Sequence, residues 1–318
     1  MITRRIQLIA ILLFCLFLGT SGVYSAAQDF ANVQIQTMKV ADNIFMLVGG
    51  GGNIGVSAGK DCVFMIDASY APLTDNIKAA IATVSNKPIQ FIINTHWHQD
   101  HPGGNENFAK SGAFLVAHEN VGKRLSTEQY IDFLKKTVPP LPASALPAIT
   151  FNEHMTFHLN GDEIYIFHIE RVHTDGDAIV HFRKSNVIHM GDIYFNGIYP
   201  FIDLSAGGSI SGMIAAVKQV LTLCNGNTKV IPGHGPLSDK TGLEAYLKML
   251  ITVRDRIDHV IKEGKNLDAV IASRPTRDFD QAWGKGFLKP EQFVRLVYDS
   301  LVKEKSQAQY HRKIEFVL

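Results

Sequence analysis

One short segment constrains the fold of this chain more than any other, namely NTHWHQDHPGGN at residues 94–105. It follows a mostly apolar run at 89–93 that is typical of a β-strand. Its candidate metal ligands lie within six residues, and they are His96, His98, Asp100 and His101. Imidazole is the commonest metal ligand in proteins, and zinc also binds carboxylates. The segment therefore predicts a metal site at the end of a strand, onto which distant parts of the chain must fold.

Three further segments supply the partners that a metal site on one loop requires. They contain His173 in RVHTDGD, Asp192 in HMGDIYF and His234 in IPGHGP. Each of these residues lies at or near the end of a predicted strand and is followed by turn residues. Together with the loop at 94–105, the chain offers seven ligands, which is enough for two metal ions rather than one.

The spacing of apolar and polar residues predicts a chain with two strand-rich halves. The predicted strands cover residues 43–48, 62–66, 90–93, 114–117 and 229–231, with hairpin turns at 160–162 and 184–186. The predicted helices cover 73–84, a segment ending near 137, 209–224 and most of the chain from 238 onward. The four prolines of PPLPASALP at 139–147 exclude a helix interior there. Two such halves predict two packed sheets with helices outside.

The glycine-rich stretch GGGGNIG at 49–55 contains the spacing of a dinucleotide-binding motif. That motif must open a helix, whereas Val56 and Ser57 continue extended structure. The stretch therefore predicts a hairpin turn and not a nucleotide site.

The first residues have the pattern of a secretory signal peptide, predicted over 1–26. Arg4 and Arg5 precede a predominantly apolar run at 6–18, and small residues allow cleavage after Ser25 or Ala27. A membrane anchor is the alternative, but this run is shorter than the roughly 20 residues that cross a bilayer. We expect a periplasmic or secreted protein without a stable membrane anchor.

Composition and charge limit the partners of the mature chain. The sequence is 46% hydrophobic and 19% charged, which is typical of a soluble globular protein. Removal of the signal leaves 29 basic and 30 acidic residues, so no basic surface for nucleic acid is predicted. Cys62 and Cys224 remain, each more typical of a small core residue than of a ligand. A disulfide between them stays an open alternative.

The four motifs NTHWHQDHPGGN, VHTDGD, MGDIYF and IPGHG resemble, in order and spacing, the metal-binding motifs of the metallo-β-lactamase superfamily. The resemblance implies a four-layer αββα sandwich, an α+β fold, over residues 36–240. It also implies the ligand sets: His96, His98 and His173 on a first metal, Asp100, His101 and His234 on a second, and Asp192 between them. Asp67 resembles the structural aspartate of the family, which ties loops near the site.

The remaining residues, 241–318, form a predicted helical extension. Its tail at 279–301 carries an apolar stripe at helical spacing, formed by Phe293, Leu296, Val297 and Leu301. We expect this stripe to pack on the main domain. A subunit interface is the alternative, and the sequence predicts no oligomeric state.

The function implied by the resemblance is that of a binuclear zinc hydrolase with two Zn²⁺ per chain. A hydroxide between the metals would attack the carbonyl of a small lactam, lactone, ester or thioester. Asp100 would orient that hydroxide and pass its proton to the leaving group. Tyr194 is the candidate donor to the developing oxyanion. With Phe195, Tyr199 and Phe201, it is also a candidate for an apolar wall beside the metals.

Two other functions remain open at this point. Differences between this sequence and known branches of the superfamily also limit the class of substrate. An iron-dependent, sulfur-oxidising dioxygenase of the same fold is disfavoured because such relatives commonly carry Glu in place of His98. A non-catalytic exported zinc-binding protein is the third possibility. Asp192 excludes the β-lactamase branch with a cysteine ligand and resembles glyoxalase II and lactonases. Glyoxalase II acts on a cytosolic thioester that an exported enzyme would seldom meet.

Overall fold

The strand β4 (Val63–Ile66) shows how the layers of this protein are built. We describe a computed structural model, which covers residue 30 and residues 32–315, so the predicted signal peptide lies outside the described residues. All four β4 residues are buried: Val63 and Met65 belong to an apolar cluster on one face of the sheet, and Phe64 and Ile66 to a cluster on the other. Successive side chains of a strand point to opposite faces, so an unbroken apolar run indicates a strand covered on both sides.

The first sheet has seven strands in the order β1-β2-β3-β4-β5-β6-β9. They are β1 (Gln36–Lys39), β2 (Ile44–Val48), β3 (Ile54–Ala58), β4, β5 (Ile89–Asn94), β6 (Phe114–His118) and β9 (Ile149–Phe151). The strands β1 to β4 pair antiparallel, whereas β4, β5, β6 and β9 pair parallel. The turn at 49–53 joins β2 to β3, so the hairpin predicted from the glycine-rich stretch is confirmed.

The second sheet has six strands in the order β10-β11-β12-β13-β14-β15. They are β10 (His154–Leu159), β11 (Asp162–His168), β12 (Ala178–Phe182), β13 (Val187–His189), β14 (Lys229–Ile231) and β15 (Ser238–Asp239). Both predicted hairpins are confirmed, because β10 pairs antiparallel with β11 and β12 with β13. The strands β13 and β14 pair parallel.

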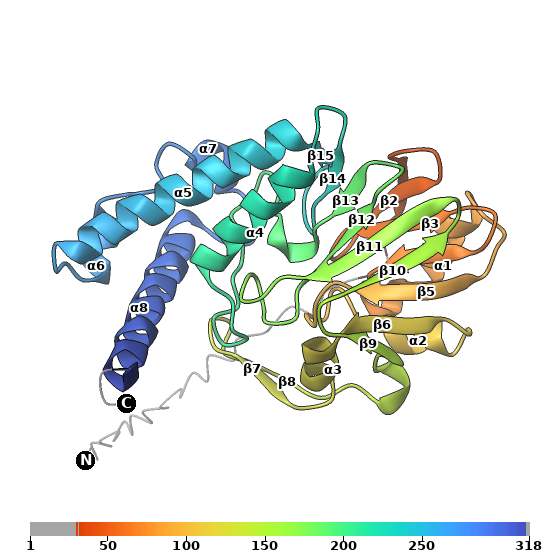
Figure 1. The fold of residues 1–318 in the computed structure, drawn as a ribbon, viewed down its shortest axis with the longest axis horizontal. Coiled ribbons are helices and arrows are strands. Elements are labelled where there is room, and N and C mark those ends of the chain that lie inside the picture. The colour runs from red at the N-terminus through yellow and green to blue at the C-terminus, as the bar shows by residue number, and fades with distance from the viewer. Residues whose placement is uncertain (1–29, 31, 316–318) are drawn as a thin grey trace, which may run out of the picture.

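Helices cover the outer face of each sheet (Figure 1). On the first sheet they are α1 (Thr74–Ala82) and α2 (Asn105–Ala109), and on the second they include α4 (Ile210–Leu223) and α5 (Lys240–Lys262). Ile77 and Ile81 of α1 pack on the first sheet, while Ile210 and Met213 of α4 join the cluster on the second. The predicted four-layer αββα sandwich is therefore confirmed. Within the described residues, no helix has the length and apolar character that crossing a membrane requires.

The helix predicted to end near residue 137 ends at Leu125 instead. The segment forms α3 (Glu119–Leu125) and then a separate antiparallel hairpin of β7 (Gln129–Ile131) and β8 (Lys136–Val138). The hydroxyls of Ser126 and Thr127 both donate to the carbonyl of Lys123. Side chains that bond to the backbone in this way compete with helix continuation, which explains the early stop. The Pro-rich segment at 139–147 is irregular apart from one 3₁₀ turn, Ala143–Ala145.

The C-terminal helices pack on α4 and on the loop after Asp192. They are α5, α6 (Leu267–Ala272), α7 (Asp280–Trp283) and α8 (Pro290–Glu315). The whole predicted tail stripe is buried, namely Phe293, Leu296, Val297 and Leu301. Phe293 stacks on Tyr199 of the loop after Asp192, with ring centroids 4.6 Å apart. The structure thus shows the tail packed on the rest of the chain.

Cys62 and Cys224 are both buried and both carry free thiols. They lie at the start of β4 and at the end of α4, respectively. Each therefore occupies a core position, in agreement with the first of the two readings that the sequence allowed.

Candidate metal centre

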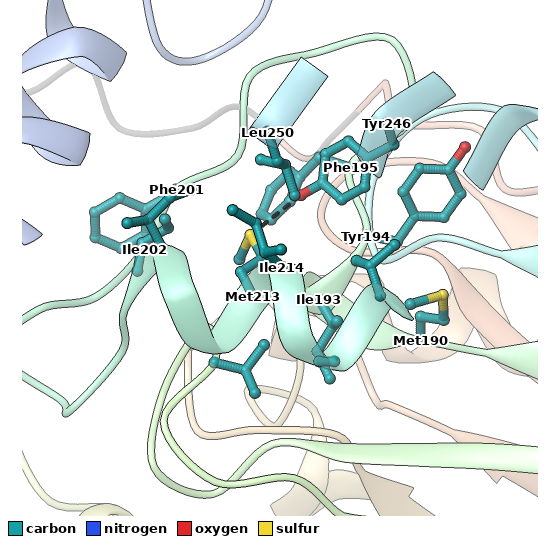
Figure 2. Packing of buried hydrophobic residues seen from close by; sticks show 14 of the residues in the cluster. Met190, Ile193, Tyr194, Phe195, Phe201, Ile202, Met213, Ile214, Tyr246 and Leu250 are labelled. Carbon is teal, nitrogen blue, oxygen red and sulfur yellow. Dashed lines mark hydrogen bonds between the residues drawn. The ribbon is translucent and has the colours of Figure 1, made fainter. Parts of the chain in front are cut away.

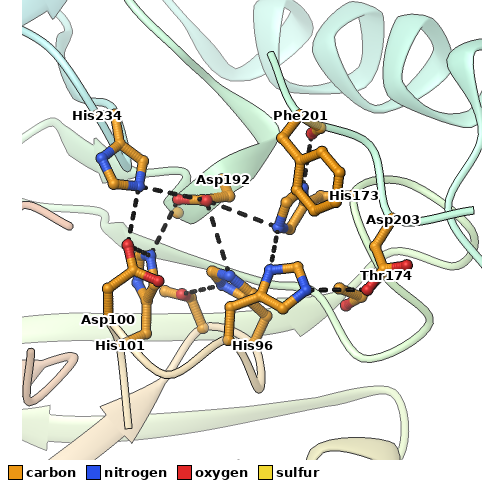
Figure 3. Close-up of polar contacts among 12 residues, drawn as sticks. His96, Asp100, His101, His173, Thr174, Asp192, Phe201, Asp203 and His234 are labelled. Carbon is orange, nitrogen blue, oxygen red and sulfur yellow. Dashed lines mark hydrogen bonds and ion pairs between the residues drawn. The ribbon is translucent and has the colours of Figure 1, made fainter. Parts of the chain in front are cut away.

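The seven predicted ligands gather where strands of both sheets end. His96, His98, Asp100 and His101 follow the carboxyl end of β5. His173 follows β11, Asp192 lies in a 3₁₀ turn directly after β13, and His234 follows β14. Because β5 belongs to the first sheet and the other three strands belong to the second, the cluster spans the two sheets at one edge of the sandwich. The structure brings all seven side chains together (Figure 3).

The cluster consists of two groups whose ligand atoms lie within 4.8 Å of one another in each group. The first group contains His96, His98, His173 and Asp192, and the second contains Asp100, His101 and His234.

Asp192 joins the two groups. Its Oδ1 lies 3.1 Å from His101 Nε2, and its Oδ2 lies 3.4 Å from His234 Nε2 and 3.7 Å from His96 Nε2. Asp192 therefore contacts residues of both groups, as its place in the resemblance implied.

The ring nitrogens of His98 and His173 show that a cation fits the first group. His98 Nε2 donates to Asp203, and His173 Nδ1 donates to the carbonyl of Phe201, at 3.0 and 2.8 Å. In neutral rings the opposite nitrogens then carry lone pairs, and these nitrogens face each other at 2.8 Å. Two facing lone pairs repel each other unless a cation binds both.

Atoms without hydrogen-bond partners point to the same conclusion. Among the described residues, four buried polar side-chain atoms lack such a partner, and three of them belong to the cluster: His96 Nε2, His101 Nε2 and Asp192 Oδ1. The last two lie 3.1 Å apart without the alignment of a hydrogen bond. His101 and Asp192 are close enough to form an ion pair, whereas His96 Nε2 has only Asp192 Oδ2 nearby, at 3.7 Å. A buried polar atom without a hydrogen bond costs about 1–3 kcal/mol, and a cation bound by these atoms would remove that cost. Imidazoles and carboxylates suit a divalent metal ion.

The pKa shifts of His96, His173 and Asp192 favour the protonation states that metal binding requires. Burial lowers the pKa of His173 to about 4, and burial together with the neighbouring His101 holds the pKa of His96 well below 6.5. Burial opposes the charge of Asp192, but His234, His101 and His96 outweigh it and hold its pKa well below 3.8. Neutral imidazoles and charged carboxylates are the forms that bind metals.

His101 and His234 differ from the other imidazoles, because carboxylates surround them. Burial disfavours their charged forms, but Asp192 and the other nearby carboxylates raise the pKa of His234 to about 10 and hold that of His101 well above 6.5. A cation that binds these two rings takes the place of their protons.

Asp67 holds the metal-binding loop from behind, as the resemblance implied. Its Oδ1 accepts from the backbone N–H of Thr95, and its Oδ2 accepts from the Thr95 hydroxyl and from His101 Nδ1, each at 2.8 Å. Thr95 Oγ1 in turn lies 3.0 Å from His96 Nδ1. One fully buried carboxylate therefore fixes His101 directly and His96 through Thr95, with Nε2 of both rings facing the cluster.

Two supporting carboxylates were missed by the sequence reasoning. Asp203 accepts from His98 and is 1% exposed, and it also accepts from the Ser205 hydroxyl. Asp177 accepts from the backbone N–H of His173 at 2.6 Å and from that of Thr174 at 2.8 Å. Asp177 could have been found from the motif VHTDGD, because its carboxylate folds back on the same motif. Asp203 lies 105 residues from His98, and no sequence signal connects them.

Two glycines allow the backbone to pass close to the ligands. A Cβ on Gly52, in the turn between β2 and β3, would lie 2.3 Å from the His101 ring. A Cβ on Gly233 would lie 2.1 Å from Asp192 Oδ1. Only glycine leaves room for the ligand at either position. The glycine-rich stretch thus serves the metal centre rather than a nucleotide.

The predicted role of Tyr194 as oxyanion donor is wrong for this structure. Tyr194 is fully buried in the core, where its ring lies 4.9 Å from that of Tyr246 of α5 (Figure 2). Its hydroxyl bonds to the hydroxyl of Ser238 at 2.8 Å rather than to a residue of the cluster. Tyr199 is also a core residue, since its hydroxyl donates to Asp280 at 2.9 Å. The phenylalanines do lie beside the metal ligands: Phe195 stacks on His234 at 5.3 Å between centroids, and Phe201 lies 5.7 Å from His98.

An αββα sandwich with a His/Asp cluster at its strand ends defines a metal-binding protein of a known structural class. The chain belongs to the metallo-β-lactamase superfamily, whose sequence profile it matches over residues 47–245. The resemblance found in the four motifs is thereby confirmed.

Individual relatives are distant. The chain is 22% identical over 244 residues to a metallo-β-lactamase type 2 of Elizabethkingia meningoseptica, covering 74% of this chain and 92% of that protein. It is 28% identical over 170 residues to a hydroxyacylglutathione hydrolase of a Polaromonas species, covering 51% and 55%, respectively. Its structure is similar to that of a metallo-β-lactamase from Pontibacter korlensis, with a TM-score of 0.57, 18% identity and coverage of 68% and 99%.

Proposed function

We propose that this protein is an exported hydrolase with two zinc ions that attacks the carbonyl carbon of a small lactam, lactone, ester or thioester and breaks its acyl C–N, C–O or C–S bond. The observation that carries this proposal is the arrangement of seven ligand side chains in two groups joined by Asp192, with three of their buried atoms lacking a hydrogen-bond partner. One metal ion does not satisfy both groups, because each already offers at least three ligand atoms.

The residues that would hold the ions follow from these groups. The three imidazoles of His96, His98 and His173 would hold one ion, and Asp100, His101 and His234 the other, with Asp192 shared. When bound, zinc polarises a carbonyl oxygen and makes hydroxide available near neutral pH.

Asp100 is the side chain best placed to move a proton in this centre. Its side chain is 20% exposed, against 6% for Asp192, so it is the carboxylate that a substrate reaches. Its Oδ2 lies 3.2 Å from His234 Nε2, which fixes the orientation of the carboxylate. We assign Asp100 to orient the attacking water, accept its proton and deliver that proton to the leaving group.

The candidate substrates are narrowed by Asp192 and by the relatives. Two relatives are named as a metallo-β-lactamase and a hydroxyacylglutathione hydrolase, which are hydrolases of a lactam and a thioester. Both classes therefore belong in the substrate panel, together with lactones, which the bridging Asp192 also suits.

The decisive experiment measures metal content and turnover on the same preparation. The chain without residues 1–26 is purified, its metals are quantified by mass spectrometry, and turnover of nitrocefin, a homoserine lactone and a simple thioester is followed. We expect about two zinc ions per chain. Asp192→Ala and His98→Ala should lose metal and turnover together, whereas His158→Ala, an exposed histidine of β10, is the matched control.

The possible outcomes separate the three functions that the sequence left open. Turnover with bound zinc supports the proposal. Iron in place of zinc, with oxygen consumption, would support the dioxygenase. Two zinc ions without turnover of any substrate would support a non-catalytic zinc-binding protein. Near-normal activity with full metal content in Asp192→Ala would contradict the assignment of the site.

Export is tested separately. The full chain is expressed in a bacterial host, and the N-terminus of the protein from the periplasm or medium is sequenced. We expect it to begin at Ala26 or Gln28, after removal of the apolar run at 6–18. Replacement of Arg4 and Arg5 by glutamate should reduce the exported fraction. Recovery of the uncleaved chain in the cytoplasm would contradict export.

A further inference from the structure

Phe287 is the most exposed large apolar side chain in the described part of the molecule, at 63%. It lies in the loop between α7 and α8, within the helical extension. A single exposed apolar residue needs no explanation, but this one belongs to a series of aromatic contacts that ends at the metal ligands. The edge of its ring meets Phe201, with centroids 6.4 Å apart and an interplanar angle of 83°.

The loop between α7 and α8 exposes Phe287, whereas the residues on either side of Phe287 pack against the rest of the protein. Leu288 is 1% exposed and belongs to the core. A Cβ on Gly286 would lie 2.6 Å from Ile198, so the loop backbone presses directly on the segment before Phe201. The carbonyl of Trp283 accepts from the backbone N–H of Tyr199 at 2.9 Å. Phe287 is therefore exposed on an anchored loop, where an aromatic ring is available to a ligand at little entropic cost.

Phe201 connects this ring to the metal centre. Its ring lies 5.7 Å from His98 and 5.8 Å from His173, as Figure 3 shows for His173. Its carbonyl accepts from His173 Nδ1. The series of ring contacts thus begins at His98 and His173, passes through the buried Phe201 and reaches the surface at Phe287.

Phe133, which is half-buried, also packs on Phe201. It lies in the turn of the β7–β8 hairpin, and its ring centroid is 5.6 Å from that of Phe201. The backbone N–H of Asp132 donates to Ser205, whose hydroxyl donates to Asp203, the partner of His98. The hairpin is therefore tied to the same carboxylate that orients a metal ligand.

We propose that the exposed Phe287 and the half-buried Phe133, both packed on the buried Phe201, form a subsite that binds an apolar substituent of the substrate, alkyl or aryl, while its carbonyl lies at the metal centre. This inference rests on the proposed function and names its substrate class: carbonyl compounds with a hydrophobic side group. The three rings come from the β7–β8 hairpin, the loop after Asp192 and the C-terminal extension, and Phe133 and Phe287 both contact Phe201. The extension thereby determines specificity in addition to packing on the fold.

The choice of an apolar ligand follows from what the subsite exposes. Phe287 is exposed on the C-terminal extension. The β7–β8 hairpin, which carries Phe133, also exposes Tyr130 at 51% and Leu134 at 38%. An alkyl or aryl group that covers such surfaces gains roughly 25 cal/mol for each Å² of apolar surface removed from water. A substrate without such a group makes no use of these rings.

The test compares p-nitrophenyl acetate with the hexanoate and octanoate esters on the zinc-loaded mature chain. We expect kcat/KM to rise about tenfold or more from acetate to octanoate in the wild type. Phe287→Ala should lower the octanoate-to-acetate ratio roughly fivefold or more, and Phe133→Ala should act in the same direction. The matched control is Phe114→Ala, an exposed phenylalanine (49%) at the opposite end of its strand from the centre.

A binding measurement separates this inference from the proposed function. Calorimetric titration with octanoate and with acetate should show tighter binding of octanoate, and Phe287→Ala should remove most of that difference. Such a result supports the subsite even where no ester is hydrolysed. Equal kcat/KM for all three esters, with octanoate bound no more tightly than acetate, would overturn the subsite and leave the hydrolase proposal intact. Circular dichroism confirms that each variant is folded.

Discussion

At the scale of single residues, the histidines of the metal centre are oriented by groups that are not themselves predicted ligands. The ring orientations of the histidines are set by Asp67, Asp203 and the carbonyl of Phe201. A histidine held by a second hydrogen bond presents one nitrogen to the metal without loss of side-chain entropy on binding. The supporting residues should therefore affect metal affinity before they affect chemistry.

The first prediction concerns Asp203. Asp203→Asn should weaken zinc binding about 10- to 100-fold, because the amide holds His98 Nε2 less firmly than the carboxylate does. Competition with a chromogenic chelator measures this affinity. Asp255→Asn, which changes an exposed carboxylate of α5, is the control. Unchanged zinc affinity in Asp203→Asn would show that the hydrogen bond to His98 does not orient the ligand.

The second prediction concerns Gly52. Gly52→Ala would place a Cβ 2.3 Å from the His101 ring, so the ring must move or the turn must open. We expect loss of about 1–3 kcal/mol of stability and loss of metal from the second group. Zinc content and thermal unfolding measure both effects. Gly226→Ala, where no atom lies within 4 Å of the added Cβ, should be neutral in both respects.

At the scale of elements, the spacing of apolar residues predicts the bounds of a strand or helix well where that element buries an apolar face. The strand at 229–231 and the helix at 209–224 were placed within a residue or two, since their apolar spacing is regular. The helix after residue 118 was extended too far because its polar sequence has no strong period. There, α3 ends at Leu125 because the hydroxyls of Ser126 and Thr127 bond to the carbonyl of Lys123.

The third prediction concerns the docking of α8. Phe293 is fully buried and stacks on Tyr199, so Phe293→Ala should lower the free energy of unfolding by about 3–5 kcal/mol. Denaturant titration measures the loss. Arg295→Ala, at an exposed position two residues later in the same helix, is the control. A change of less than about 1 kcal/mol in Phe293→Ala would mean that α8 does not contribute to the cooperative core.

At the scale of the whole molecule, contacts between the two sheets hold the edge that carries the metal centre. One such contact lies outside the centre: the rings of His118, at the end of β6, and His168, at the end of β11, stack 3.7 Å apart. His118 Nε2 also donates to the carbonyl of Asn152 at 3.0 Å. Burial, together with the charge that His168 would carry, lowers the pKa of His118 to about 4.

The fourth prediction follows from that pKa. The unfolded chain binds a proton at His118 near pH 6.5, and the folded chain binds it only near pH 4. Stability from this group is therefore complete above pH 6.5 and is lost as the pH falls toward 4, by about 1–2 kcal/mol at pH 5. His118→Asn, which keeps an acceptor for the N-terminus of α3, should show a weaker acid dependence in thermal unfolding. An identical pH profile would contradict this assignment.

The sequence by itself determined which side chains form the His/Asp cluster, because metal chemistry restricts ligands to few residue types and the four motifs place those types at strand ends. It also determined the four-layer fold, since the apolar periods of strands and helices are local. Only the tertiary structure decided which groups support the ligands. Asp203 meets His98 across 105 residues, and Phe287 approaches Phe201 from the far end of the chain. The core position of Tyr194 was decided in the same way, because packing of α5 and the bond to Ser238 turn its hydroxyl away from the centre. Such contacts depend on how the elements pack, so they cannot be predicted from a local sequence pattern.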